Sequence, residues 1–302
     1  MLCAGRPRIL GSALRCAWEP WDVSALCADA LRGMSVLTPD HADAGVPAHP
    51  TSMVEVAARV AALDPAADVD DVVGRLVQIE RARDGFYDPD GGGPAARAAR
   101  APRPDGVACF NGLYLCVTRA VREALPRFAA RAFVERLDVV FAEFYFEAYR
   151  AATAGAWSSR AWAPLFEASD ARRVLPLQFA LAGMNAHINN DLAYALVQTW
   201  RELGLEPGVD TPEHRDFVAV NGILKGVEQR VKTVLEDPFV ADLDHLLGCV
   251  DDRLALWSVA KARSDAWERA LHMHAHPDAL YDAFHDRAVG FAGHLLLAPV
   301  LP

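Results

Sequence analysis

Several features that often reveal a function are missing from this 302-residue chain. None of its six cysteines belongs to a Cys-x-x-Cys pair, so neither a zinc knuckle nor a redox-active dithiol is indicated. Six cysteines are also too few for a disulfide scaffold in a chain of this length. Cys109 and Cys116 lie in apolar helical sequence, and we expect both to be reduced thiols in the core.

Positive charge is scarce as well. The chain has 30 Lys and Arg against 40 Asp and Glu, its formal net charge is −10, and its basic residues do not gather into a stripe. Proteins that bind nucleic acid carry a basic surface that neutralises phosphates. The sequence therefore predicts that nucleic acid is not a partner.

No segment is both long enough and apolar enough to cross a bilayer. The longest uncharged run, residues 174–190, is short for a span and includes polar residues such as Asn185 and His187. The apolar stretch near the N-terminus is interrupted by Arg15 and Glu19, which does not fit a secretory signal. We therefore expect a cytoplasmic protein with no membrane span.

Strand patterns and common nucleotide or nucleophile motifs are absent too. We find no sustained alternation of apolar and polar residues, no P-loop, no Rossmann glycine pattern and no nucleophile elbow. Apolar residues instead recur at helical spacing through most of the chain. The expected helices cover approximately residues 53–63, 72–79, 107–124, 129–152, 177–203, a stretch from 212 onward, 239–249, 251–272 and a last one opened by Pro277.

These segments predict an all-α, single-domain, multi-helix globular bundle of about eight helices. Residues 1–50 lack a sustained period and are expected to form a partly irregular N-terminal arm, and residues 51–302 the helical domain. Within that domain, residues 85–105 are rich in Gly and Pro and are predicted to be a mobile loop. Residues 288–302 carry no charged side chain and many apolar ones, so we expect them to pack back onto the bundle or across a homodimer interface.

The most informative segment for function is GMNAHINND at residues 183–191. His187 and Asp191 are four residues apart, which places them on one face of a helix, and that face also carries Met184 and Ile188. A buried His and Asp must be hydrogen-bonded or bind something, because their isolated burial costs several kcal/mol. Gly183 leaves room for another helix or a ligand to come close.

Three interpretations of this pair remain open. His187 and Asp191 could clamp one divalent metal such as zinc, manganese or iron. Asp191 could instead orient His187 as a general base. The third interpretation is structural: a buried polar network that fixes the register of neighbouring helices.

Further candidates come from other helical faces. Asp138 is an acid within an apolar run, its i+7 neighbour is Tyr145, and we expect it to face inward as a third catalytic candidate. Asn185, Asn221, Tyr145 and His214 are candidate ligand-binding residues. We predict that Asp138, His187 and Asn221 converge in one pocket or buried cluster, since mutual hydrogen bonding is the least costly way to bury them. Arg263 lies four residues before Trp267, and for it a cation–π or buried ion-pair role and a surface role are both open.

Three stretches carry a resemblance to a known family. FNGLY at 110–114, LDVVFA at 137–142 and GMNAHIN at 183–189 are similar to an uncharacterised, mainly actinobacterial family, domain of unknown function 5995. The resemblance covers about residues 53–298 and also includes the surroundings of His214 and Asn221. It implies a helical fold but no particular activity.

A weaker resemblance, confined to one motif, links the chain to zinc-dependent phospholipase C and single-strand nucleases. Those helical enzymes use His-x-x-x-Asp pairs as zinc ligands, and His187 with Asp191 matches one pair. His274 and Asp278 have the same spacing, but Pro277 lies between them, and the N-terminal Trp ligand of those enzymes has no counterpart. The resemblance therefore does not imply a trinuclear zinc site.

Two functional hypotheses follow. In the first, the protein is an enzyme acting on a small apolar molecule, either a metal-assisted hydrolase or an acid–base lyase or cyclase, with His187, Asp191 and Asp138 at its centre. In the second, it binds a ligand or a partner without catalysis, and the same residues form a structural network.

Overall fold

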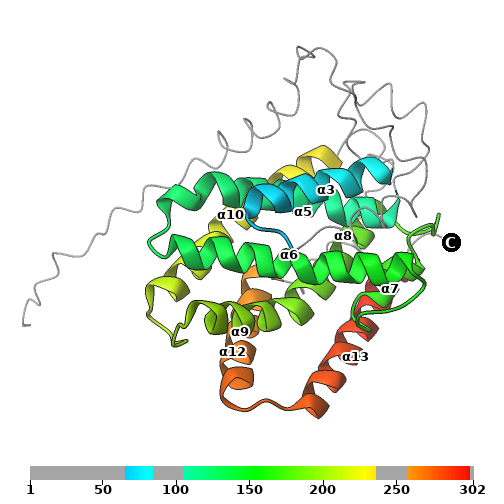
Figure 1. The fold of residues 1–302 in the computed structure, drawn as a ribbon. Coiled ribbons are helices and arrows are strands. Elements are labelled where there is room, and N and C mark those ends of the chain that lie inside the picture. Colours follow the sequence, from blue (N-terminus) through cyan, green and yellow to red (C-terminus); the bar gives the residue numbers. More distant parts are fainter. Residues whose placement is uncertain (1–64, 84–104, 236–257, 300–302) are drawn as a thin grey trace, which may run out of the picture.

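The computed structural model describes residues 65–83, 105–235 and 258–299, and within these ranges the chain consists of helices and connecting turns (Figure 1). The elements are α3 (Val69–Ala82), α5 (Gly106–Ala124), the 3₁₀-helix η1 (Leu125–Arg127), α6 (Arg131–Thr153), α7 (Ala163–Glu167), α8 (Pro176–Met184), the π-helix η2 (Asn185–Asp191), α9 (Leu192–Leu203), α10 (Pro212–Leu235), α12 (Val259–Ala275) and α13 (Ala279–Leu296). The predicted all-α multi-helix bundle is confirmed.

Local capping explains where several helices begin and end. Asp68 accepts a hydrogen bond from the Asp71 amide at 2.9 Å, and Thr211 accepts one from the His214 amide at 3.1 Å, so both side chains close the first turn of their helix. Pro212 follows as the first residue of α10, where its fixed φ suits a helix start. Gly204 ends α9 in the left-handed conformation with φ 62°, which glycine adopts without strain.

Packing places α5 at the centre of the bundle. It lies against α3 on one side and α8 on the other, while α9 contacts both α6 and α12. Figure 1 shows α3, α5 and α6 running alongside one another, with α12 and α13 diverging at the opposite edge of the molecule. The largest fully buried side chains are aromatic and line the junction of these helices: Trp162, Trp200, Tyr145, Tyr149, Phe110, Phe133 and Phe146.

One predicted helix begins later than expected, and several other predicted segments lie outside the described residues. The helix expected over residues 251–272 begins only at Val259, because Ser258 is extended and caps it, and the helix continues to Ala275. The arm at 1–50, the helices predicted at 53–63 and 239–249, and residues 85–104 of the predicted loop lie outside the described residues. The last residue of that loop, Asp105, caps α5 and forms an ion pair with Arg83 at 2.8 Å.

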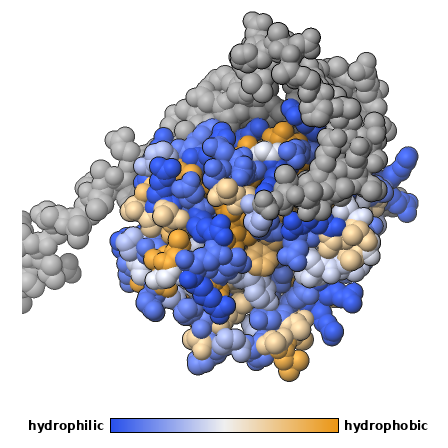
Figure 2. Space-filling view, viewed as in Figure 1, coloured by the Kyte–Doolittle hydropathy of each residue, from blue (hydrophilic) through white to orange (hydrophobic). Residues whose placement is uncertain are grey.

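The C-terminal segment packs onto the bundle along one face of α13. Val289 and Leu297 are buried, and Gly290 lies so close to the Arg160 backbone that a Cβ would clash. On the opposite face of α13, Phe291 is 66% and Leu295 is 56% exposed. The predicted packing of this segment onto the bundle therefore applies to only one face of the helix. No described helix is long and apolar enough to span a bilayer. Figure 2 shows a face that is mostly hydrophilic, with hydrophobic residues in small separate groups.

Candidate functional site

A π-helical segment, η2, interrupts the long helix that the sequence predicts over residues 177–203. The Leu192 amide bonds to the His187 carbonyl, an i→i+5 contact, so Asn185–Asp191 form a widened turn between α8 and α9. Such segments are rare and often occur at functional sites. The spacing still brings His187 and Asp191 together, as the sequence predicts, although the turn is wider than in an α-helix.

Two neighbouring helices stabilise the widened turn. Arg269 of α12 donates to the carbonyls of Asn189 and Asn190 at 3.4 and 3.3 Å, and His285 of α13 contacts the Asn189 carbonyl at 2.8 Å through Nε2. Arg269 is itself paired with Asp282 of α13 at 3.0 Å. Side chains of α12 and α13 therefore contact two backbone carbonyls of the widened turn.

His187 is enclosed by aromatic rings. Phe141 of α6 stacks on the imidazole with a centroid distance of 3.5 Å and an interplanar angle of 4°, and Tyr114 of α5 meets it edge-on at 4.6 Å. Burial lowers the pKa of His187, and the hydrogen bond that its Nδ1 donates to Asp191 opposes this shift only in part. The imidazole is therefore neutral near pH 7.

Asp191 fixes the orientation of that ring. Its Oδ2 lies 3.2 Å from His187 Nδ1 and also accepts a hydrogen bond from Trp162 Nε1 at 2.9 Å. Its Oδ1 accepts a third hydrogen bond, from Asn190 Nδ2 at 2.9 Å. Because a carboxylate only accepts, Nδ1 of the neutral ring carries the proton and Nε2 carries the lone pair. Nε2 has no hydrogen-bond partner among the described residues.

The predicted metal clamp does not fit this geometry. Both oxygens of Asp191 already accept hydrogen bonds, and His187 Nδ1 is directed at one of them, so neither side chain has a free ligand atom on their shared side. The described ranges contain no group of three or more His, Cys, Asp or Glu side chains that could hold a metal ion. The second pair with this spacing is also divided, because His274 contacts Trp200 while Asp278 caps α13.

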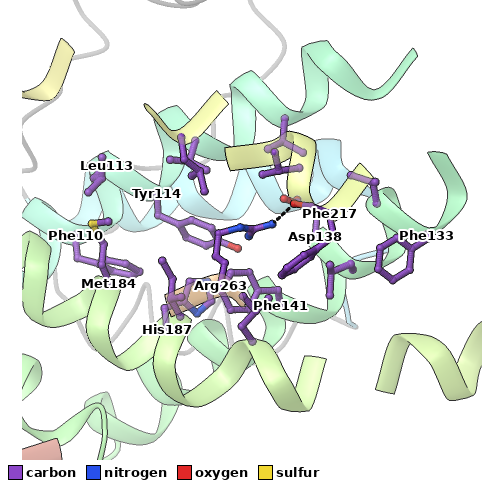
Figure 3. Close-up of a pocket in the computed structure, with 18 residues that line it drawn as sticks. Phe110, Leu113, Tyr114, Phe133, Asp138, Phe141, Met184, His187, Phe217 and Arg263 are labelled. Carbon is purple, nitrogen blue, oxygen red and sulfur yellow. Dashed lines mark hydrogen bonds between the residues drawn. The ribbon is translucent and has the colours of Figure 1, made fainter. Parts of the chain in front are cut away.

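A narrow cavity adjoins the imidazole. The space open to the centre of a water molecule is about 90 Å³, and apolar side chains from α5, α6, α8, η2, α9 and α10 form most of the wall (Figure 3). The side chains that bring polar atoms to the lining are Tyr114, Asp138, His187 and Arg263. The pocket thus has room for a small organic molecule with a few polar groups, as ligand sites commonly do.

Asp138 enters the cavity from α6, one turn before Phe141. Its Oδ2 is enclosed and makes no hydrogen bond, although the residue as a whole keeps some exposure. Burial raises the pKa of its carboxyl to about 7. The expected inward orientation is present, and Arg131 does not satisfy the carboxylate because it contacts Glu135 instead.

Arg263 enters from α12 and connects Asn221 to the cavity. Its Nε donates to Asn221 Oδ1 at 2.8 Å, one amino group donates to the Phe217 carbonyl at 2.8 Å, and the guanidinium lies 4.1 Å from the centre of the Phe217 ring. Burial lowers the pKa of Arg263 to about 9. Asp138 and His187 therefore line one cavity, as predicted, whereas Asn221 reaches it only through Arg263.

The remaining predicted ligand-binding residues lie outside the cavity lining. Tyr145 is fully buried and donates to Asn111 Oδ1 at 3.3 Å. Asn185 donates to the Val289 carbonyl at 2.9 Å and so anchors α13. His214 packs against Trp267 with a centroid distance of 4.8 Å near the start of α10. These three side chains are placed to support the fold around the site.

Sequence reasoning missed two contributors, the Asp191 partner Trp162 and the edge-on ring of Tyr114, and it left the place of Arg263 open. Trp162 and Tyr114 read as ordinary core aromatics, since nothing in a single sequence shows which helix an indole N–H will face. For Arg263 a usable signal existed, because the residue lies four positions before Trp267 on an otherwise core-facing stripe.

A known protein family covers most of this chain, including the site. A model of the Family of unknown function (DUF5995) matches residues 69–299. The chain belongs to the DUF5995 family. Comparisons with curated proteins and with solved structures return no match. The DUF5995 match includes η2, Asp138 and Arg263, so the whole cavity falls within the family's domain and not in an appendage to it.

Proposed function

We propose that the protein is an enzyme that moves a proton on a small, mainly apolar substrate held in the cavity, with His187 as the general base. The observation that carries this proposal is the arrangement around the imidazole. The ring is neutral, Asp191 fixes it through Nδ1, and His187 lines the cavity while its Nε2 has no hydrogen-bond partner among the described residues. A carboxylate that holds the tautomer and steadies the imidazolium is a recurring device of histidine bases.

Asp138 supplies the complementary group. Burial raises the pKa of its carboxyl to about 7, while burial lowers the pKa of His187, so near neutral pH a proton donor and a proton acceptor face the same cavity. Pairs of titratable groups whose pKa values are shifted in opposite directions mark acid and base roles. Returning a proton from Asp138 to a substrate that has lost one to His187 is the chemistry of lyases, isomerases and cyclases.

The lining favours acid–base chemistry over the other enzyme classes. No Ser, Thr, Cys or Lys lines the described cavity, so covalent catalysis by one of these four residue types has no nucleophile there. The hydrogen bonds that His187 Nδ1 and both Asp191 oxygens already make favour an orienting role for Asp191 over the metal-ligand role of the metal-assisted hydrolase alternative. An acid–base lyase or cyclase is therefore the function that the geometry supports best.

Deuterium exchange tests this proposal without knowledge of the substrate. A small-molecule extract in D₂O is incubated with the protein and followed by mass spectrometry, because a base that removes a proton from carbon allows deuterium to return in its place. We expect one metabolite, or a few, to gain deuterium or change mass. His187→Gln should slow this by about 10²–10⁴-fold, the usual contribution of a general base.

The matched control is His294→Gln on the exposed side of α13, which should exchange at the wild-type rate. If His187→Gln, folded as judged by its melting curve, exchanges as fast as wild type, His187 is not the base. If neither protein alters any metabolite while a small molecule still binds the cavity, the non-catalytic ligand-binding function is the correct one.

A further inference from the structure

Arg263 differs from the other buried arginines of this protein. Arg75, Arg83 and Arg269 each have a carboxylate partner: Glu143 at 2.9 Å, Asp105 at 2.8 Å and Asp282 at 3.0 Å. Arg263 is equally buried, with 6% of its surface exposed, yet it forms no ion pair with any described carboxylate. Of these four arginines, Arg263 alone has no carboxylate partner among the described residues.

Neutral groups hold Arg263 in place without neutralising it. Two of its N–H groups donate to Asn221 Oδ1 and to the Phe217 carbonyl, and its face rests on the Phe217 ring. The other amino group makes no hydrogen bond to a described residue. A guanidinium has five N–H donors, so donors remain free on the side chain that lines the cavity. Figure 3 shows it extending among the apolar lining residues.

A buried cation without a counter-charge is costly, and the cost is removed when an anion binds next to it. Guanidinium is suited to a carboxylate because its planar N–H groups match the two oxygens. Asp138 does not supply that partner, since it forms no ion pair with Arg263 and its carboxyl Oδ2 has no donor. The other residues that line the described cavity carry no negative charge.

We infer that the cavity recognises a small apolar carboxylate, an aliphatic or aromatic acid whose carboxylate binds Arg263 and whose hydrocarbon part lies along the apolar wall toward His187. This inference rests on the proposed function for the identity of the ligand as substrate, but the binding itself does not depend on catalysis. The wall from Leu113, Val117, Val121, Leu137 and Leu224 supplies the hydrocarbon contacts. The space of about 90 Å³ suits a small hydrocarbon chain beyond the carboxylate.

Calorimetric titration of the full chain with acetate, butanoate, hexanoate and hexanamide tests the inference. Hexanoate should bind at least about tenfold more tightly than its uncharged isostere hexanamide, since a charge-assisted pair is lost in the amide. Affinity should rise by about fourfold per added methylene from acetate to hexanoate, as burial of CH₂ groups predicts. Arg263→Met should reduce hexanoate binding to the hexanamide level, whereas Arg287→Met, at an exposed position of α13, should change nothing.

His187→Gln separates this inference from the proposed function. If this variant binds hexanoate like wild type but does not support deuterium exchange, the carboxylate site and the general-base role both stand. If deuterium exchange is unaffected while the preference for hexanoate over hexanamide persists, only the general-base role fails. Equal affinity for hexanoate and hexanamide in the wild-type protein overturns the inference, even where Arg263→Met does not fold. Equal affinity for acetate and hexanoate overturns it too, because the site would then take a bare anion.

Discussion

The cavity brings together two regions whose polar groups are satisfied to different degrees. On the η2 side, the Asp191 carboxylate accepts hydrogen bonds from Trp162, Asn190 and His187. On the side formed by α6 and α12, Asp138 has an enclosed oxygen without a donor and Arg263 has no described acid. Buried polar atoms are normally paired, so the second region is the unusual one.

This difference separates two roles. A network that only fixed helix register would satisfy all its members, as the η2 side nearly does. The exceptions there are Asn190 Oδ1 and His187 Nε2, and of these two residues only His187 lines the cavity. Unsatisfied atoms from η2, α6 and α12 therefore gather around one small space, where a bound molecule can complete them. The satisfied region gives the site its shape, and the unsatisfied region is left for the ligand.

Asp191→Ala should have the largest effect on stability. It leaves three buried donors without an acceptor, one of them the Trp162 indole, and opens a void beside them. We expect the free energy of unfolding to fall by about 3–5 kcal/mol, the usual result of breaking a buried polar pair. Urea denaturation followed by tryptophan fluorescence measures the loss.

Two further variants allow the η2 side of the cavity to be compared with the side formed by α6 and α12. Arg263→Met replaces the unpaired cation with an apolar side chain and should cost no more than about 1 kcal/mol, or even stabilise the unliganded protein. Asp265→Ala removes an exposed α12 carboxylate and should change stability by less than about 0.5 kcal/mol. Equal losses in Asp191→Ala and Arg263→Met would abolish the distinction between the two regions.

Gly183→Ala should have the next largest effect. A Cβ at this position would lie closer than 3.0 Å to the Cβ and ring atoms of Phe110, which is itself held between Tyr145 and Trp162. Overpacking of this kind costs about 1–3 kcal/mol, and the shifted ring should also displace His187, its neighbour at 5.8 Å. Thermal melting measures the stability, and the exchange assay measures the effect on the base.

Gly74→Ala is the matched control, because a Cβ on that turn of α3 meets no atom within 4 Å. There the substitution should stabilise the helix by about 0.5–1 kcal/mol. If Gly183→Ala is as well tolerated as Gly74→Ala, the close contact of α8 with α5 does not position the imidazole.

The sequence predicted the parts of this site that depend on local spacing. Helical periodicity and the caps at Asp68, Thr211 and Gly204 locate their helices closely, because those signals act within a few residues. The His187 and Asp191 contact follows from their spacing of four. What could not be predicted depends on which helices meet: the donation from Trp162 crosses 29 positions, and the widened turn of η2 needs Arg269 from α12. Nothing local indicates that Arg263 lacks an acid.

The last prediction concerns Asp138 and the pH dependence of stability. Its pKa in the folded protein is about 7 against an ordinary value of 3.8, so the folded state holds the proton more tightly than the unfolded state. Ionisation of Asp138 therefore lowers the free energy of unfolding of the wild-type protein. This loss is absent below about pH 4, grows as pH rises toward 7 and is complete above pH 7. Asp138→Asn cannot ionise, so the stability of the variant relative to wild type should increase from pH 5 to pH 8. Each pKa unit corresponds to about 1.36 kcal/mol, and water entering the cavity reduces the full amount, so we expect an increase of about 1–2 kcal/mol.

His187 has the opposite pH dependence, because its neutral burial costs stability as pH falls below the ordinary pKa of histidine. This effect is common to both proteins and cancels in the difference. Urea denaturation of both proteins at the two pH values gives this quantity, with Asp265→Asn as the exposed control that should show no such trend. A flat difference for Asp138→Asn would mean that Asp138 is satisfied in the folded protein, and the acid that complements His187 would have to be sought elsewhere.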